Sequence, residues 1–99
     1  MGFEYKLRTK LTENQLGEIQ NLLASDLMFD KKYKYEGEEF WDYRKASNTG
    51  KLPNIHIIFM EDGIYICQYN SSYLWTDLDK LKSYIESNDI DYEIIDYQD

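Results

Sequence analysis

Residues 55–69 read IHIIFMEDGIYICQY, and this stretch decides the fold. Two apolar runs, Ile55–Met60 and Ile64–Tyr69, lie on either side of the dipeptide Asp62-Gly63. Asp-Gly is a favoured loop for a two-residue β-hairpin because both residues tolerate the positive φ of a type I′ turn. The stretch therefore predicts an antiparallel hairpin that turns at Asp62-Gly63.

This turn fixes a register for the hairpin, with Glu61 opposite Ile64 and His56 opposite Tyr69. Side chains alternate between the two faces of a strand, so the register assigns every residue to a face. One face carries Ile55, Ile57, Phe59, Ile64, Ile66 and Gln68. The other face carries His56, Ile58, Met60, Tyr65, Cys67 and Tyr69. We expect the first face to pack against helices and the second to be wetter.

A strand and a helix are expected at the start of the chain. Phe3–Leu11 alternates apolar and polar residues, which is the pattern of a half-buried strand. Thr12 and Gln15 then match a capping box, in which each side chain binds the other residue's backbone N–H. Apolar residues at spacings of three and four predict an amphipathic helix from about Glu13 to about Ser25.

The segment between this helix and the hairpin gives weaker patterns. Residues 28–37 mix charged and aromatic side chains, and we interpret them as a connecting loop with at most a short extended piece. Residues 39–45 contain Phe40, Trp41 and Tyr43, which favour a strand, but the sequence leaves open whether that strand joins the sheet. Residues 46–54 are rich in Ser, Asn, Gly and Pro and predict a loop.

A second helix and a final strand are expected after the hairpin. The apolar residues that define the helix recur at spacings of four, three and four: Leu74, Leu78, Leu81 and Ile85. Its candidate N-caps are Thr76 and Ser72, and it is expected to end near Asn88. Ile90–Tyr97 predicts the last strand.

The predicted element order is β-α-β-β-β-α-β within a single α+β domain, residues 1–99. Right-handed crossovers would place both helices on one face of a mainly antiparallel sheet, which makes a two-layer sandwich. This arrangement is a ferredoxin-like variant with one extra strand.

The chain is acidic, with a net charge of −8, and the charge is unevenly placed. Residues 1–50 hold eight Lys/Arg and nine Asp/Glu, whereas residues 51–99 hold three and ten. Such a field repels nucleic acid phosphates and attracts a basic protein. No apolar run approaches the ~20 residues of a membrane span, and the N-terminus lacks the apolar core of a signal peptide. We expect a cytoplasmic protein that binds neither nucleic acid nor membrane.

The only histidine and the only cysteine, His56 and Cys67, are expected as diagonal neighbours on one hairpin face. A Cys–His nucleophile pair also needs an orienting group and an oxyanion hole, and no local motif supplies them. One His and one Cys do not complete a tetrahedral zinc site, and the five glycines form no phosphate-binding motif. We therefore expect no catalytic residues, metal or cofactor, and keep an enzyme or ligand binder using His56 and Cys67 as an alternative.

The acidic last third of the chain is the first candidate binding surface, because tyrosines interleaved with carboxylates suit a protein interface. Its candidate residues are Asp77, Asp79, Tyr84, Glu86, Asp89, Asp91, Tyr92, Glu93 and Tyr97. The wetter hairpin face adds His56, Tyr65 and Tyr69. We expect a basic protein as the partner. The alternative is a homodimer that forms through the hairpin face.

In size, charge and composition, the chain resembles the small acidic immunity and antitoxin proteins that bacteria pair with secreted nucleases. The resemblance implies an inhibitor of a basic toxin or nuclease. It rests on bulk properties of the whole chain and assigns no role to any single residue.

Overall fold

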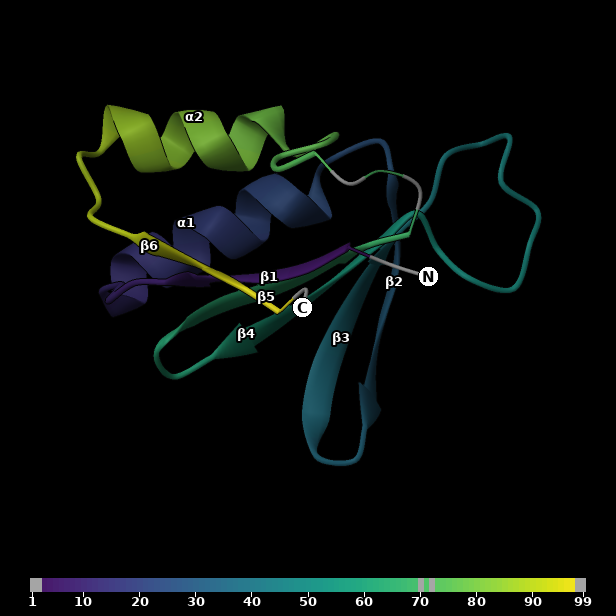
Figure 1. Ribbon diagram of the computed structural model, residues 1–99, viewed down its shortest axis with the longest axis horizontal. Coiled ribbons are helices and arrows are strands. Elements are labelled where there is room, and N and C mark those ends of the chain that lie inside the picture. The colour runs from purple at the N-terminus through teal and green to yellow at the C-terminus, as the bar shows by residue number, and fades with distance from the viewer. Residues whose placement is uncertain (1–2, 70, 72, 98–99) are drawn as a thin grey trace.

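The computed structural model describes residues 3–69, 71 and 73–97. It is an α+β fold in which the described residues form one six-stranded sheet and two helices (Figure 1). In chain order the elements are β1 Phe3–Arg8, α1 Glu13–Ala24, β2 Phe29–Tyr35, β3 Glu38–Tyr43, β4 Ile55–Met60, β5 Gly63–Gln68, α2 Asp79–Ser87 and β6 Glu93–Asp96.

The strands lie side by side in the order β2-β3-β4-β5-β1-β6, and every neighbouring pair is antiparallel. The predicted antiparallel sheet is therefore confirmed. β4 and β5 lie in its interior, while β2 and β6 form its two edges.

The element order contains one strand more than the predicted β-α-β-β-β-α-β. Residues 28–37, interpreted as a loop, supply β2, and the segment 39–45 does join the sheet as β3. β2 is exposed along nearly its whole length. An edge strand that buries almost nothing has no alternation of apolar and polar residues, so the periodic pattern by which a strand is recognised is missing.

The central hairpin forms as predicted, but its register differs. Met60 lies opposite Gly63 and His56 opposite Cys67, so the two turn residues are Glu61 and Asp62. A Cβ on Gly63 would lie 2.1 Å from the backbone oxygen of Leu7. Gly63 is thus a strand residue that pairs with Arg8 of β1 rather than a turn residue. The pairing moves by an even number of positions, so each side chain keeps its predicted face.

The type I′ turn expected at Asp62-Gly63 is found instead between β2 and β3. Glu36 and Gly37 connect these strands, with φ values of 52° and 84°. Positive φ at both central residues matches the right-handed twist of the flanking strands. An added Cβ at Gly37 would meet no atom within 4 Å, so this glycine serves only the turn.

The first helix agrees with its prediction and the second begins later than predicted. The Thr12–Gln15 capping box is present in α1, with both side chains bonded to backbone N–H groups at 3.0–3.1 Å. α2 starts at Asp79 and has no side-chain cap, so Thr76 is not its N-cap, and Ser72 lies outside the described residues. β6 is shorter than the predicted Ile90–Tyr97.

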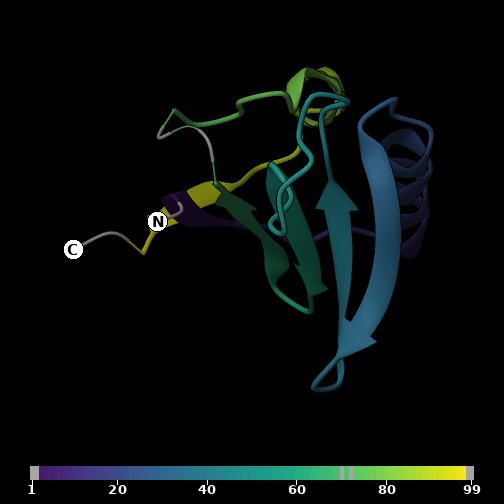
Figure 2. The same cartoon turned by 90° about the vertical axis from the view of Figure 1, so that its right-hand side faces the viewer.

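Side chains of both helices pack with inward-facing strand side chains and form the core. The buried cluster joins Ile19, Leu23, Leu81 and Ile85 from the helices to Tyr5, Leu7, Trp41, Tyr43, Ile55, Ile57, Ile64 and Ile66 from the strands. Figure 2 shows α1 behind β2 and α2 at the top of the view. The opposite side of the sheet, which we call the outer face, carries Glu4, Lys6, Lys31, Tyr33, Phe40, Asp42, His56, Ile58, Met60, Tyr65, Cys67 and Tyr69.

Candidate binding face of the sheet

Three chemically active side chains form a row across the middle of the outer face. Asp42 on β3 lies opposite His56 on β4, and His56 lies opposite Cys67 on β5. Directly opposed residues in antiparallel strands have Cβ atoms about 4.5–5.5 Å apart. The register therefore brings Cys67 closer to His56 than the predicted diagonal position and adds a carboxylate on the other side.

His56 lies within a set of aromatic rings. Its ring centroid is 5.2 Å from Phe40, 5.4 Å from Tyr69 and 5.9 Å from Tyr65. Nδ1 shares a hydrogen bond of 3.0 Å with the Tyr69 hydroxyl. Burial lowers the pKa of His56, although the charge of Glu4 opposes this shift. The imidazole is therefore neutral at neutral pH.

Cys67 is a buried thiol. Burial raises its pKa, and the hydroxyls of Tyr69 and Tyr65 oppose that shift. A cysteine nucleophile acts as the thiolate, usually beside a protonated base. A neutral thiol beside a neutral imidazole gives the opposite arrangement, so the geometry favours packing over nucleophilic chemistry at this pair.

Asp42 is the unusual residue of the row. It is only 3% exposed, and its Oδ1 is a buried atom without a hydrogen-bond partner. Burial raises the pKa of this carboxyl, while Lys31 and the Tyr33 hydroxyl act in the opposite direction. Leaving a buried polar atom unpartnered costs about 1–3 kcal/mol. Asp42 therefore lowers the free energy of unfolding of the chain.

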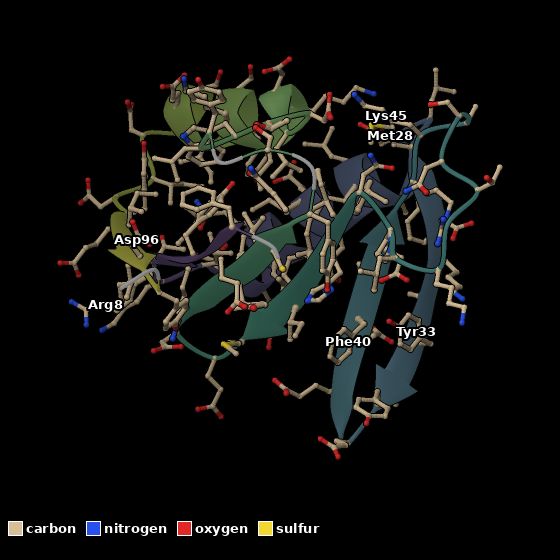
Figure 3. The ribbon with its side chains drawn as sticks, turned by 45° about the vertical axis from the view of Figure 1, so that its right-hand side comes forward. Arg8, Met28, Tyr33, Phe40, Lys45 and Asp96 are labelled. Carbon is tan, nitrogen blue, oxygen red and sulfur yellow. The ribbon has the colours of Figure 1, made fainter. Side chains whose placement is uncertain are left out.

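Aromatic side chains continue the row to both edges of the sheet. Tyr33 and Phe40 stack with ring centroids 5.5 Å apart and planes 14° apart, and Figure 3 shows the two rings side by side. At the other end, Tyr97 lies 5.9 Å from Tyr65. Together these rings give the outer face a broad aromatic surface that extends to the exposed strand β2.

The predicted binding residues fall into two separate groups. His56, Tyr65, Tyr69 and Tyr97 belong to the outer face or border it. Asp79, Tyr84 and Glu86 lie on α2, and Asp89, Asp91 and Tyr92 lie between α2 and β6. The sequence predicted these two surfaces separately, but it assigned Tyr97 to the acidic one, whereas the structure places Tyr97 beside Tyr65 of the hairpin face.

Several residues of the acidic group already have partners within the chain. Asp77 pairs with Lys45 at 3.4 Å, and Glu93 pairs with Arg8. The Tyr84 hydroxyl donates a hydrogen bond of 2.8 Å to Glu18. These contacts give part of the acidic group a structural role.

Asp42, Tyr33 and Phe40 were not among the binding residues predicted from the sequence. A charged residue between Trp41 and Tyr43 in an aromatic strand was a usable indication that Asp42 lies where burial is expected. Its significance depends on pairing with His56, which no local pattern indicates.

Over the described ranges, no group of three or more His, Cys, Asp or Glu residues is arranged to hold a metal ion. Among the same residues, no helix has the length and apolarity needed to cross a membrane. Comparison of the chain with models of known families, with characterised proteins and with solved structures gave no match.

Proposed function

We propose that this chain is a non-enzymatic protein-binding module whose partner is basic, most concretely an inhibitor of the immunity or antitoxin type. The observation that carries the proposal is the outer face, where aromatic rings surround a buried carboxylate with an unpartnered oxygen. Tyrosine-rich surfaces provide large contact area at low entropic cost. The net charge of −8 supports a basic partner, because opposite charge speeds association.

We also propose that the fold is a two-layer, ferredoxin-like variant. Without β2 and β3, the chain order is β-α-β-β-α-β and the strand order is β4-β5-β1-β6. The β2–β3 hairpin is then an addition at the β4 edge. It contributes three outer-face residues to the proposed binding surface: Tyr33, Phe40 and Asp42.

A pair of matched tyrosines tests the binding proposal. Tyr33 on the outer face and Tyr92 in the acidic group are both 38% exposed. Tagged wild-type chain, Tyr33→Ala and Tyr92→Ala are used to retain proteins from a lysate of the source organism. A retained protein is then purified and its affinity for each chain is measured by calorimetry at low and high salt.

The expected result is a basic protein that binds wild type and Tyr92→Ala but binds Tyr33→Ala much more weakly, with affinity falling as salt screens the charges. Loss with Tyr92→Ala alone would move the interface to the acidic group and overturn the outer-face proposal. The outer-face proposal would also be overturned if no retained protein were lost on replacing Tyr33 with alanine.

A homodimer through the same face is the second candidate, because the face also carries the apolar side chains Ile58 and Met60. Sedimentation of the purified chain over a range of concentrations tests this candidate. A dimer that Tyr33→Ala dissociates and Tyr92→Ala leaves intact would favour self-association over a basic partner. Monomer throughout would exclude it.

A further inference from the structure

We propose that Asp42 and the rings beside it form a binding site for an arginine side chain of a basic protein. The rings belong to Tyr33, Phe40, His56 and Tyr69. The inference rests on the proposed function and deepens it, since it names the group that the partner contributes and the residues that receive it.

The carboxylate supplies the charge of the site. Asp42 is 97% buried, and its Oδ1 accepts no hydrogen bond in the free chain. A buried carboxylate is stabilised by a cation or by hydrogen-bond donors, and a guanidinium offers both in one planar group. An anionic ligand would instead be repelled by Asp42 and by the net charge of the chain.

The rings supply the walls of the site. Tyr33 stacks on Phe40, Phe40 meets His56 edge-on, and His56 contacts Tyr69. Aromatic faces attract cations through the ring quadrupole, and arginine stacks on them through its planar guanidinium. Cation and carboxylate recognition therefore coincide at one place on the outer face.

Lys31 shows that a cation is already accommodated here. Its Nζ lies 5.5 Å from the centroid of the Tyr33 ring. Its charge also acts on Asp42, since it opposes the rise in the pKa of that carboxyl. Among the described residues, Lys31 and Asp42 do not form an ion pair within 4 Å. Lys31 is thus a distant cation that leaves Oδ1 available to a closer one.

Entry to the site requires a side-chain movement, because Asp42 Oδ1 is shielded from solvent in the free chain. Lys31 and Tyr33 are exposed side chains on the edge strand β2, which pairs with β3 on one side only. Rotamer changes of exposed side chains occur in picoseconds to nanoseconds. In the proposed site, Lys31, which lies opposite Asp42, moves aside to admit the guanidinium, while the Tyr33 ring stays as a wall of the site.

Short peptides test the proposal without knowledge of the partner. The probes are acetyl-Ala-Arg-Ala-amide, its lysine analogue and its citrulline analogue, which has nearly the shape of arginine without the charge. Each is titrated into the isotope-labelled whole chain, and NMR shifts are followed at Tyr33, Phe40 and His56. The variants are Asp42→Asn and, as a control that removes the same charge elsewhere, Asp91→Asn. Asp91 is exposed and lies before β6.

We expect saturable shifts at these residues when the arginine peptide is added to the wild type. Asp42→Asn should bind this peptide at least about tenfold more weakly, which corresponds to about 1.4 kcal/mol. Asp91→Asn should bind it as the wild type does. The citrulline peptide should give no saturable shifts, and the lysine peptide should bind more weakly than arginine. Equal binding to wild type and Asp42→Asn, or equal binding of citrulline and arginine, would overturn the proposal. If the peptide test fails while retention of a partner still depends on Tyr33, only the arginine site is overturned. If retention is independent of Tyr33 as well, the proposed function is overturned too.

Discussion

The two hairpins of the sheet differ in what their residues do. β4 and β5 occupy the middle of the sheet and bury most of their side chains, and Gly63 lies beside β1 with no room for a Cβ next to the Leu7 carbonyl. β2 lies at the edge and is almost wholly exposed, and Gly37 has open space around it. The central hairpin therefore determines the architecture, while the edge hairpin tolerates side chains chosen for another purpose.

The same contrast separates two buried polar residues. Gln68, at the end of β5, accepts a hydrogen bond from the Tyr5 hydroxyl and donates to the carbonyls of Ser71 and Tyr73. Asp42, on β3, has an oxygen with no partner. A fully partnered polar residue stabilises a fold, whereas an unpartnered one destabilises it. This difference points to a structural role for Gln68 and a binding role for Asp42.

The largest expected effect comes from replacing Gly63 in the central hairpin, with Gly37 in the edge hairpin as the comparison. In Gly63→Ala, the new Cβ would collide with the Leu7 carbonyl oxygen, so β1 and β5 must separate. We expect a loss of more than about 2 kcal/mol of unfolding free energy. Gly37→Ala meets no atom but places alanine at φ 84°, and should lose only about 1 kcal/mol. Urea denaturation of both variants measures the difference, and equal losses would contradict the distinction between the hairpins.

A smaller loss is expected from Gln68→Leu. Leucine has a similar size but leaves the Tyr5 hydroxyl without its acceptor and two loop carbonyls without their donor. We expect the variant to lose about 2 kcal/mol. The double variant with Tyr5→Phe should lose less than the sum of the two single variants, because the two residues interact directly. Strict additivity in denaturation experiments would rule out the partnered network as the reason for Gln68.

The pH dependence of stability should report His56, with a smaller effect. Because burial lowers its folded pKa below the ordinary 6.5, the unfolded chain takes up the proton first on acidification. The stability contributed by neutral His56 is therefore present above about pH 6.5 and is lost as the pH falls below that value. His56→Gln keeps an acceptor for Tyr69 and should show a flatter decline in melting temperature. If melting temperature fell equally with pH in the wild type and in His56→Gln, His56 would not be the source of the pH dependence.

The sequence predicts the central hairpin because Ile55, Ile57 and Ile66 alternate with wetter residues, and burial is what creates such alternation. It predicts α1 for a similar reason, since the Thr12–Gln15 capping box is a local contact. The register was wrong because Asp62-Gly63 satisfies a turn rule, whereas Gly63 is required by β1, a contact distant in sequence.

The candidate site was only partly predictable. His56, Tyr65 and Tyr69 follow from the alternation of the central hairpin, which assigns them to the wetter face. Tyr33 and Asp42 do not, because β2 lacks the periodicity by which strands are recognised, and the role of Asp42 depends on its position opposite His56. A site assembled across strands that are far apart in sequence leaves little trace in any one segment.

The unfolding free energy of Asp42→Asn at neutral pH tests the central claim most directly. Burial raises the pKa of Asp42 in the folded chain above its value in the unfolded chain. The ionised carboxylate therefore destabilises the folded chain relative to the unfolded one, and the stability of the fold falls as the pH rises through the folded pKa. Asparagine removes the charge and keeps the size. We predict that the variant is as stable as the wild type or more stable, as expected for a residue retained for binding. A loss of more than about 1 kcal/mol would instead show that Asp42 stabilises the fold.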